Sequence, residues 1–158
     1  MQTSDPLTQF ACAFSAIIHD ADHAGIPNVQ LVREKSELAN KYKNKSVAEQ
    51  NSVDLCWDLL MTPAYEDLRR CIYTTKEELD RFRQLVVNSV MATDIVDKQL
   101  GAARKQRWEK AFAIRSNSDH SPLSDPLSTR DDVNRKATIV IEHLIQASDV
   151  AHTMQHWQ

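Results

Sequence analysis

Apolar residues recur every three or four positions along most of the chain, which is the spacing of one buried face of an α-helix. The clearest stripe is Phe82, Val86 and Val90, set in an otherwise polar stretch. A similar stripe opens the chain, with Phe10, Phe14, Ile17 and Ile18. No two alternating, strand-like runs are joined by a hairpin turn. The pattern therefore predicts an all-α fold, a compact bundle of several helices.

Start and stop signals divide this pattern into separate helices. Asp5 before Pro6 is a typical helix start, and Ser46-x-x-Glu49 is typical of a capping box. The predicted helices span residues 5–20, 30–42, 46–60, 65–73, 74–100, 102–114 and 131–152. Residues 115–130 are rich in Ser, Asp and Pro, so we expect an exposed loop there.

Composition narrows the possible functions. A net charge of -3 offers no electrostatic footprint for nucleic acid, and the basic cluster at residues 104–110 is interpreted as a solvated helix face. The longest apolar run, Phe10 to Ile18, is about half of what a bilayer requires, so this segment is expected to make no membrane contact. Three cysteines without a C-x-x-C pair favour a reduced, cytoplasmic setting, which includes the cytosolic part of a larger membrane protein.

Candidate chemistry gathers in the string His19-Asp-Ala-Asp-His23, directly behind the first apolar stripe. An imidazole and an adjacent carboxylate offer one nitrogen and one oxygen ligand, and a carboxylate can bridge two divalent ions. Asp149 continues the helical face of Ile141 and Ile145, where a surface Asp would not be placed. A buried carboxylate needs a cation or donors nearby, so His19, Asp20 and Asp149 are candidate metal ligands.

Each candidate also has a purely structural interpretation. His19 could be a core histidine bonded to a carboxylate, and Asp149 a partly exposed carboxylate at a helix end. Glu49 could serve only the capping box. Thr93, which continues the stripe of Val90, could bond back to the preceding helical turn. The residues alone leave these alternatives open.

Taken together, several ordered motifs resemble the catalytic domain of the 3',5'-cyclic nucleotide phosphodiesterases, an all-α branch of the HD metal-dependent phosphohydrolases. The motifs are His19-Asp-Ala-Asp-His-Ala-Gly-Ile-Pro-Asn28, Ser36-Glu-Leu-Ala39 with Tyr42, Ser46-Val-Ala-Glu49, Met91-Ala-Thr-Asp-Ile95 and Gln146-Ala-Ser-Asp-Val-Ala-His152. The resemblance runs from about Asp5 to the end of the chain and is weakest between Gly101 and Asp132.

The resemblance implies a role for each matching residue. His19, Asp20 and Asp149 would hold a tightly bound ion, usually zinc, and Asp20 would bridge to a second, usually magnesium. The water ligands of that second ion would be oriented by His23, Glu49 and Thr93. His152 would lie near the nucleotide.

Three departures from the family pattern suggest that residues 1–158 are a partial domain. Residues 1–18 hold no histidine, although the family places there a general acid and a further zinc ligand. Asn51 and Ser52 stand where the family has two histidines after the glutamate. The residues that read the base would follow Gln158.

The resemblance therefore implies hydrolysis of the 3' phosphoester of cyclic AMP or cyclic GMP to the 5'-monophosphate, in signal transduction, with the isolated chain incomplete. The alternatives are a non-catalytic helical module or degenerate copy, and another HD-type phosphohydrolase.

Overall fold

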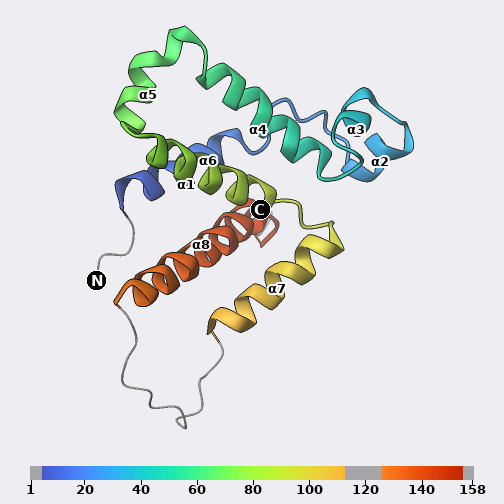
Figure 1. Ribbon diagram of the computed structural model, residues 1–158. Helices are drawn as coiled ribbons and strands as arrows, with labels where there is room; N and C mark the ends of the chain where they lie inside the picture. The colour runs from blue at the N-terminus through green and yellow to red at the C-terminus, as the bar shows by residue number, and fades with distance from the viewer. Residues whose placement is uncertain (1–4, 113–125, 155–158) are drawn as a thin grey trace.

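The computed structural model describes residues 5–112 and 126–154, and every regular element in these ranges is helical, as the sequence predicts (Figure 1). The α-helices are α1 (Pro6–Ile18), α2 (Asn28–Arg33), α3 (Glu37–Lys41), α4 (Val47–Leu60), α5 (Glu66–Ile72), α6 (Lys76–Met91), α7 (Lys98–Phe112) and α8 (Pro126–Val150). Two short 3₁₀ helices, η1 (Pro63–Tyr65) and η2 (Ala151–Met154), complete them.

Helix α6 is the centre of the main core. The side chains of its stripe, Phe82, Val86 and Val90, are fully buried against α1 and α4. The Phe82 ring lies 5.7 Å from that of Phe14 and 5.9 Å from that of Trp57, measured between centroids. Because α1 and α4 both pack on α6, the ends of these two helices are held in fixed relative positions.

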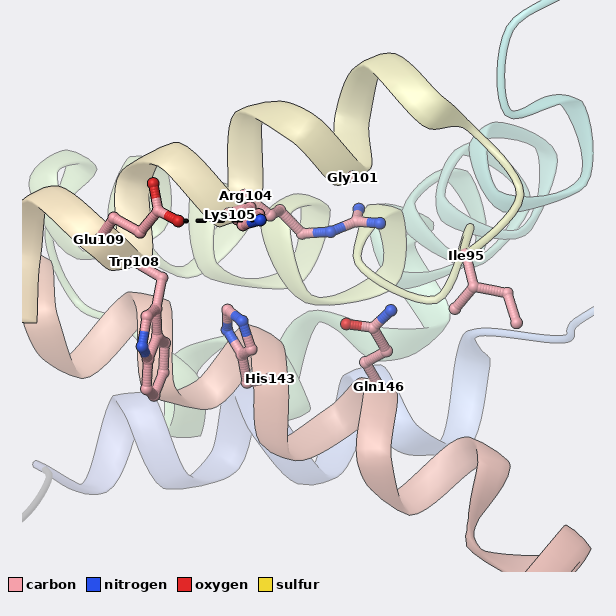
Figure 2. A pocket seen from close by; sticks show the side chains of 8 residues that line it. All are labelled: Ile95, Gly101, Arg104, Lys105, Trp108, Glu109, His143 and Gln146. Carbon is pink, nitrogen blue, oxygen red and sulfur yellow. Dashed lines mark ion pairs between the residues drawn. The ribbon is translucent and has the colours of Figure 1, made fainter.

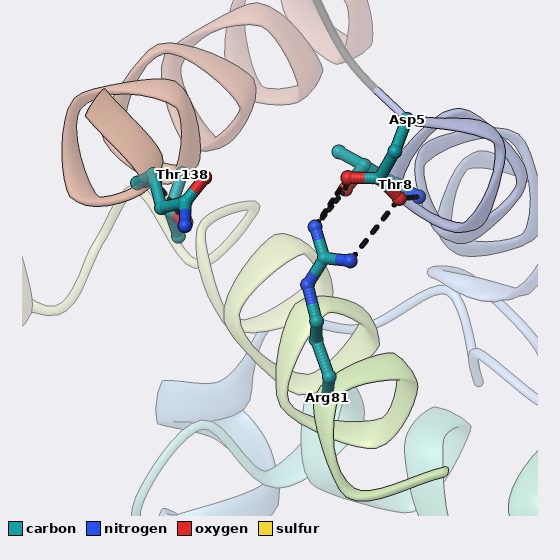
Figure 3. A network of polar contacts seen from close by, with 5 residues as sticks. Asp5, Thr8, Arg81 and Thr138 are labelled. Atoms are coloured by element: carbon teal, nitrogen blue, oxygen red, sulfur yellow. Dashed lines mark hydrogen bonds and ion pairs between the residues drawn. The ribbon is translucent and has the colours of Figure 1, made fainter. Parts of the chain in front are cut away.

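A polar contact also fastens α1 to α6. The Arg81 guanidinium of α6 binds the Asp5 carboxylate and donates to the Thr8 hydroxyl at 2.9 Å (Figure 3). Asp5 caps α1 as expected, since its carboxylate accepts from the Thr8 backbone N–H. The hydrogen bond from Arg81 is the main reason that the pKa of Asp5 is lowered to about 2.

The helix predicted over residues 30–42 is wrong, because it is broken into α2 and α3. Lys35 adopts a left-handed conformation with φ 52°, which ends the first helix, and the Ser36 hydroxyl then caps the second by accepting from Ala39 N–H. Both helices cover a small second core with α4, formed by Leu31, Ala39, Tyr42 and Val47.

The helix predicted over residues 74–100 is also too long. It ends at Met91, and the buried Asp94 carboxylate accepts from the backbone N–H groups of Val96 and Asp97. Asp97 in turn accepts from the first N–H groups of α7, which contains Gly101. These side-chain bonds give the backbone an alternative to continuing the helix.

The basic cluster on α7 is not simply a solvated face. Arg104 is buried, and its guanidinium donates to the carbonyl oxygens of Met91 and Asp94 at 3.4 and 3.0 Å. Arg107 forms a two-pronged ion pair with Glu142, a buried carboxylate of α8. The cluster therefore attaches α7 to its two neighbours.

Helix α8 begins earlier than residue 131. Its first residue is Pro126, which suits a first turn because the backbone N–H that proline lacks has no helical partner there. Residues 126–130 of the predicted loop are therefore helical, and residues 115–125 lie outside the described part of the chain. Among the described helices, none combines the length and apolar character needed to cross a lipid bilayer.

Candidate functional site

His19 lies where α1 ends and meets α8. Its Nε2 atom lies 3.3 Å from Oδ1 of Asp149 and 3.6 Å from Oδ2 of Asp20. On the other side of the ring, Nδ1 lies 3.0 Å from the carbonyl oxygen of Ala16. The fold thus brings together the three candidate ligands from opposite ends of the chain.

The hydrogen bonding of this imidazole decides what it can hold. A carbonyl oxygen can only accept, so Nδ1 carries a proton and donates it, and Nε2 faces two carboxylates. Such a contact requires either a second ring proton or a cation that the nitrogen and the carboxylates share. One imidazole nitrogen with carboxylate oxygens is a donor set that suits divalent ions, and a backbone bond that fixes the ring is typical of ligating histidines.

The coordination shell is nevertheless partial. Within residues 5–112 and 126–154, no three or more His, Cys, Asp or Glu side chains are arranged as a ready ion site. The Asp20 side chain is 68% exposed, whereas the Asp149 side chain is 32% exposed and less buried than the sequence suggested.

The three residues expected to orient water also lie together. His23, Glu49 and Thr93 line one small pocket of about 120 Å³, between the start of α2, the first turn of α4 and the segment after α6. Asn28 and Asp94 complete its polar wall.

Glu49 is the central charge of this pocket. Burial raises the pKa of its carboxyl group, and the hydrogen bond from Asn28 is the strongest opposing influence. The nearby Asp94 raises the pKa further and His23 lowers it.

The capping box predicted for Ser46 and Glu49 is wrong. Ser46 has a left-handed backbone, with φ 36°, and makes no side-chain bond to its own helix. Its hydroxyl instead donates to Oδ2 of the buried Asp94 at 2.6 Å. Glu49 therefore forms no capping box with Ser46; its carboxylate accepts from the Asn28 amide and from its own backbone N–H. For Thr93, the bond back to the preceding turn is confirmed, since its hydroxyl donates to the Val90 carbonyl at 2.8 Å.

Helix α4 also holds the loop that carries Asp20. The Ser52 hydroxyl donates to the Ala21 carbonyl at 2.8 Å, and the Asn51 amide donates to the Asp22 carboxylate at 3.0 Å. Asp22 has φ 60°, a conformation that is strained for most residues and needs such support. The two positions that depart from the family pattern therefore have a structural role here.

His152 and His143 are not among the two groups of site residues described above. His152 lies in η2, but its side chain is outside what the structure describes, so its predicted place near a nucleotide stays a prediction. His143 lines a second, larger pocket of about 440 Å³ between α7 and α8, where its ring packs 4.4 Å from that of Trp108 (Figure 2). That pocket contains none of the predicted site residues.

Sequence reasoning gave no role to Asn28, Asp94, Asn51 or Ser52, although all four shape the site. Asn28 and Asp94 lie within the motifs quoted above; Asn28 is the first residue of α2, and Asp94 follows three residues after the end of α6. For Asn28 and Asp94, the available signal in the sequence was a polar residue near a helix end. The hydrogen-bond partner of each of the four residues lies far along the chain, so the sequence could not reveal the contact.

Comparisons with known proteins give the family and the fold of this chain. The family described as 3'5'-cyclic nucleotide phosphodiesterase matches residues 1–158. A dual specificity calcium/calmodulin-dependent 3',5'-cyclic nucleotide phosphodiesterase of Homo sapiens is 36% identical over 86 residues, which are 54% of this chain and 12% of that protein. A probable 3',5'-cyclic-AMP phosphodiesterase of Caenorhabditis elegans is 34% identical over 89 residues, 56% of this chain and 13% of that protein.

Among solved structures, the phosphodiesterase domain of a RhoPDE fusion protein from the choanoflagellate Salpingoeca rosetta has the same fold. The TM-score is 0.67 at 21% identity, and the match covers 93% of this chain and 41% of that one. This chain thus spans less than half of the structure and about an eighth of the curated relatives. The family match over its whole length shows that the chain belongs to the 3',5'-cyclic nucleotide phosphodiesterases.

Proposed function

We propose that this chain is part of an enzyme that hydrolyses the 3' phosphoester of a 3',5'-cyclic nucleotide to the 5'-monophosphate, using two divalent ions. The observation that carries the proposal is the contact between Nε2 of His19 and Oδ1 of Asp149, 3.3 Å apart, in a chain that belongs to this family. One relative is named as a probable cyclic-AMP phosphodiesterase and another as a dual specificity cyclic nucleotide phosphodiesterase, so cyclic AMP is the first substrate to test and cyclic GMP the second.

His19, Asp20 and Asp149 are the residues that would hold the first ion, with zinc expected, and Asp20 would share the second, with magnesium expected. Such a pair of ions supplies a hydroxide from water at neutral pH and offsets negative charge at the phosphorus. The donor chemistry around His19 Nε2 fits this role, as described above.

The remaining residues would bind and orient water. His23 Nδ1 accepts from the Gly25 backbone N–H at 3.1 Å, so the proton of the neutral ring is on Nε2, which can donate. The Glu49 carboxylate can only accept when ionised, and Thr93 retains acceptor capacity beside its bond to Val90. Together they offer a water in this pocket both a donor and acceptors. His152 is proposed to contact the nucleotide.

In this proposal the 158 residues act within a longer protein in the cytoplasm, in cyclic nucleotide signalling. The partial coverage of the relatives supports the longer protein, since the solved phosphodiesterase domain extends beyond the matched region. The general acid and the residues that read the base would come from outside this segment.

The test compares the 158-residue chain with a protein extended in both directions by its own coding sequence. The isolated chain should hydrolyse cyclic AMP and cyclic GMP at most feebly, because losing a general acid alone typically removes a factor of 10²–10⁴. The extended protein should regain activity, and Asp20→Asn should abolish it. Asp67→Asn, at a fully exposed side chain of α5, is the matched control.

Robust turnover by the isolated chain would show that the segment contains its own acid, with His152 the first residue to test. A folded extended protein without activity on either cyclic nucleotide would contradict the proposal. Hydrolysis of another nucleotide or of a lipid phosphate would then favour a different HD-type reaction, and no hydrolysis at all would favour a non-catalytic module.

A further inference from the structure

We propose that Asn28 is the positioning residue of the water-binding pocket, where it fixes the position of the Glu49 carboxylate and donates a hydrogen bond to it. Asn28 is the first residue of α2, yet its side chain reaches across to α4. Its Nδ2 donates to Glu49 Oε2 at 2.8 Å, and its Oδ1 accepts from the Ala48 backbone N–H at 2.9 Å. This inference rests on the proposed function, in which Glu49 orients a water.

The chemistry of the two partners fixes the orientation of the amide. A backbone N–H can only donate and an ionised carboxylate can only accept, so a flipped amide would face a donor with a donor and an acceptor with an acceptor. The side chain of Asn28 is therefore specified at both ends. It joins the backbone of α4 to the carboxylate that this helix carries.

Asn28 takes over a task that the start of α4 cannot perform for itself. The first N–H groups of a helix lack partners within it, and a side chain at the helix start usually supplies one. Here the hydroxyl of Ser46 is bonded to Asp94, so Asn28 caps the helix from another element. The same contact therefore sets both where α4 begins and where the Glu49 carboxylate lies.

The contact also matters for charge. Glu49 is partly buried beside Asp94, and both burial and that second carboxylate favour a protonated Glu49. A protonated carboxyl group would lose acceptor capacity toward a water. The Asn28 amide stabilises the ionised form by donating to it, which a packing role alone would not require.

Asn28→Asp separates the two roles. The aspartate would still offer an oxygen that accepts from the Ala48 N–H at the N-terminus of α4. Its other oxygen would replace the NH₂ group that donates to Glu49. Asn28→Ala removes both contacts. Asn40→Asp is the matched control, because it adds the same charge at an exposed amide that bonds to the Lys35 carbonyl.

The first readouts use the 158-residue chain and no metal. In thermal unfolding at pH 7, both variants should lower Tm: Asn28→Ala removes both bonds, and Asn28→Asp disfavours the ionised Glu49 in the folded chain. The loss in Asn28→Asp should shrink at a pH low enough to protonate Glu49. Carbon-13 NMR of the Glu49 side chain, assigned with Glu49→Gln, should show its pKa rising by about one pH unit or more in Asn28→Asp. Asn40→Asp should leave that pKa unchanged. An unchanged Glu49 pKa in folded Asn28→Asp would overturn the proposal.

The second readout uses the extended protein. Asn28→Asp should lower kcat about 10- to 100-fold with KM for the cyclic nucleotide unchanged, the range typical of residues that support a metal site from behind its ligands. An unchanged kcat would overturn the positioning role. If the extended protein hydrolyses no cyclic nucleotide, the proposed function fails, and the NMR titration still decides separately whether Asn28 sets the state of Glu49.

Discussion

Replacing Phe82 with alanine tests whether the candidate site depends on the core beneath it. The ring is fully buried in α6 and contacts the rings of Phe10 and Phe14 on α1 and of Trp57 on α4. Helix α1 ends at Ile18, directly before His19, so the same ring supports the helix that delivers this candidate ligand.

The expected loss is large. Removing a buried phenylalanine typically costs about 3–5 kcal/mol, and aromatic pairs add about 0.5–1.5 kcal/mol each beyond the buried area. Because Phe82 is fully enclosed and its ring contacts are not additive, we expect a loss of about 4 kcal/mol in the free energy of unfolding. Most small domains have only about 5–15 kcal/mol in total, so this substitution should leave the chain barely stable.

The assay is urea unfolding at pH 7 followed by far-ultraviolet circular dichroism. The control is Phe112→Ala, at a residue 40% exposed near the end of α7, which should cost about 1 kcal/mol or less. A loss below about 2 kcal/mol for Phe82→Ala would refute the view that this ring anchors α1 and α4.

Three further predictions concern single positions. Zinc should raise the Tm of the chain, and Asp149→Ala should remove that shift; equal shifts in both proteins would contradict a shared site with His19. Asp5 has its pKa lowered to about 2, so its contribution is present above pH 4 and is lost as pH falls toward 2. Asp5→Asn should therefore cost about 1 kcal/mol at pH 7, since this ion pair is nearly half exposed, and only a small fraction of that at pH 2, as urea unfolding at both pH values will show. Gly101→Ala should stabilise the chain by about 0.5–1 kcal/mol in the same assay, because the added methyl meets open space inside a helix; a lower stability would show that this space is needed.

The helical fold was predictable because burial and periodicity coincide in this chain. Phe82, Val86 and Val90 form a stripe of spacing four, and the structure buries all three completely. The start of α1 at Asp5 was predictable as well, since its cap acts within one turn. Such signals are local, so a single sequence reveals them.

The errors arose where a side chain has a distant partner. Ser46 resembles a local capping residue, but its hydroxyl bonds to Asp94, which no spacing rule could indicate. The end of α6 at Met91 was missed because Val90 continues an apolar stripe. The helix stops because the Asp94 side chain accepts hydrogen bonds from the backbone N–H groups of Val96 and Asp97. Within the site, the residue types could be chosen from the motifs, but the contact of Asn28 with Glu49 required coordinates.

The bond between Ser52 and the Ala21 carbonyl has a consequence for how this sequence can change. Ser52 is 1% exposed, so no room exists there for an imidazole, and the carbonyl would lose its donor. A single substitution toward the histidine of the family pattern would therefore disturb the loop beside Asp20 before any new group could serve a reaction. A histidine at this position would therefore need coordinated changes in α4 and in this loop.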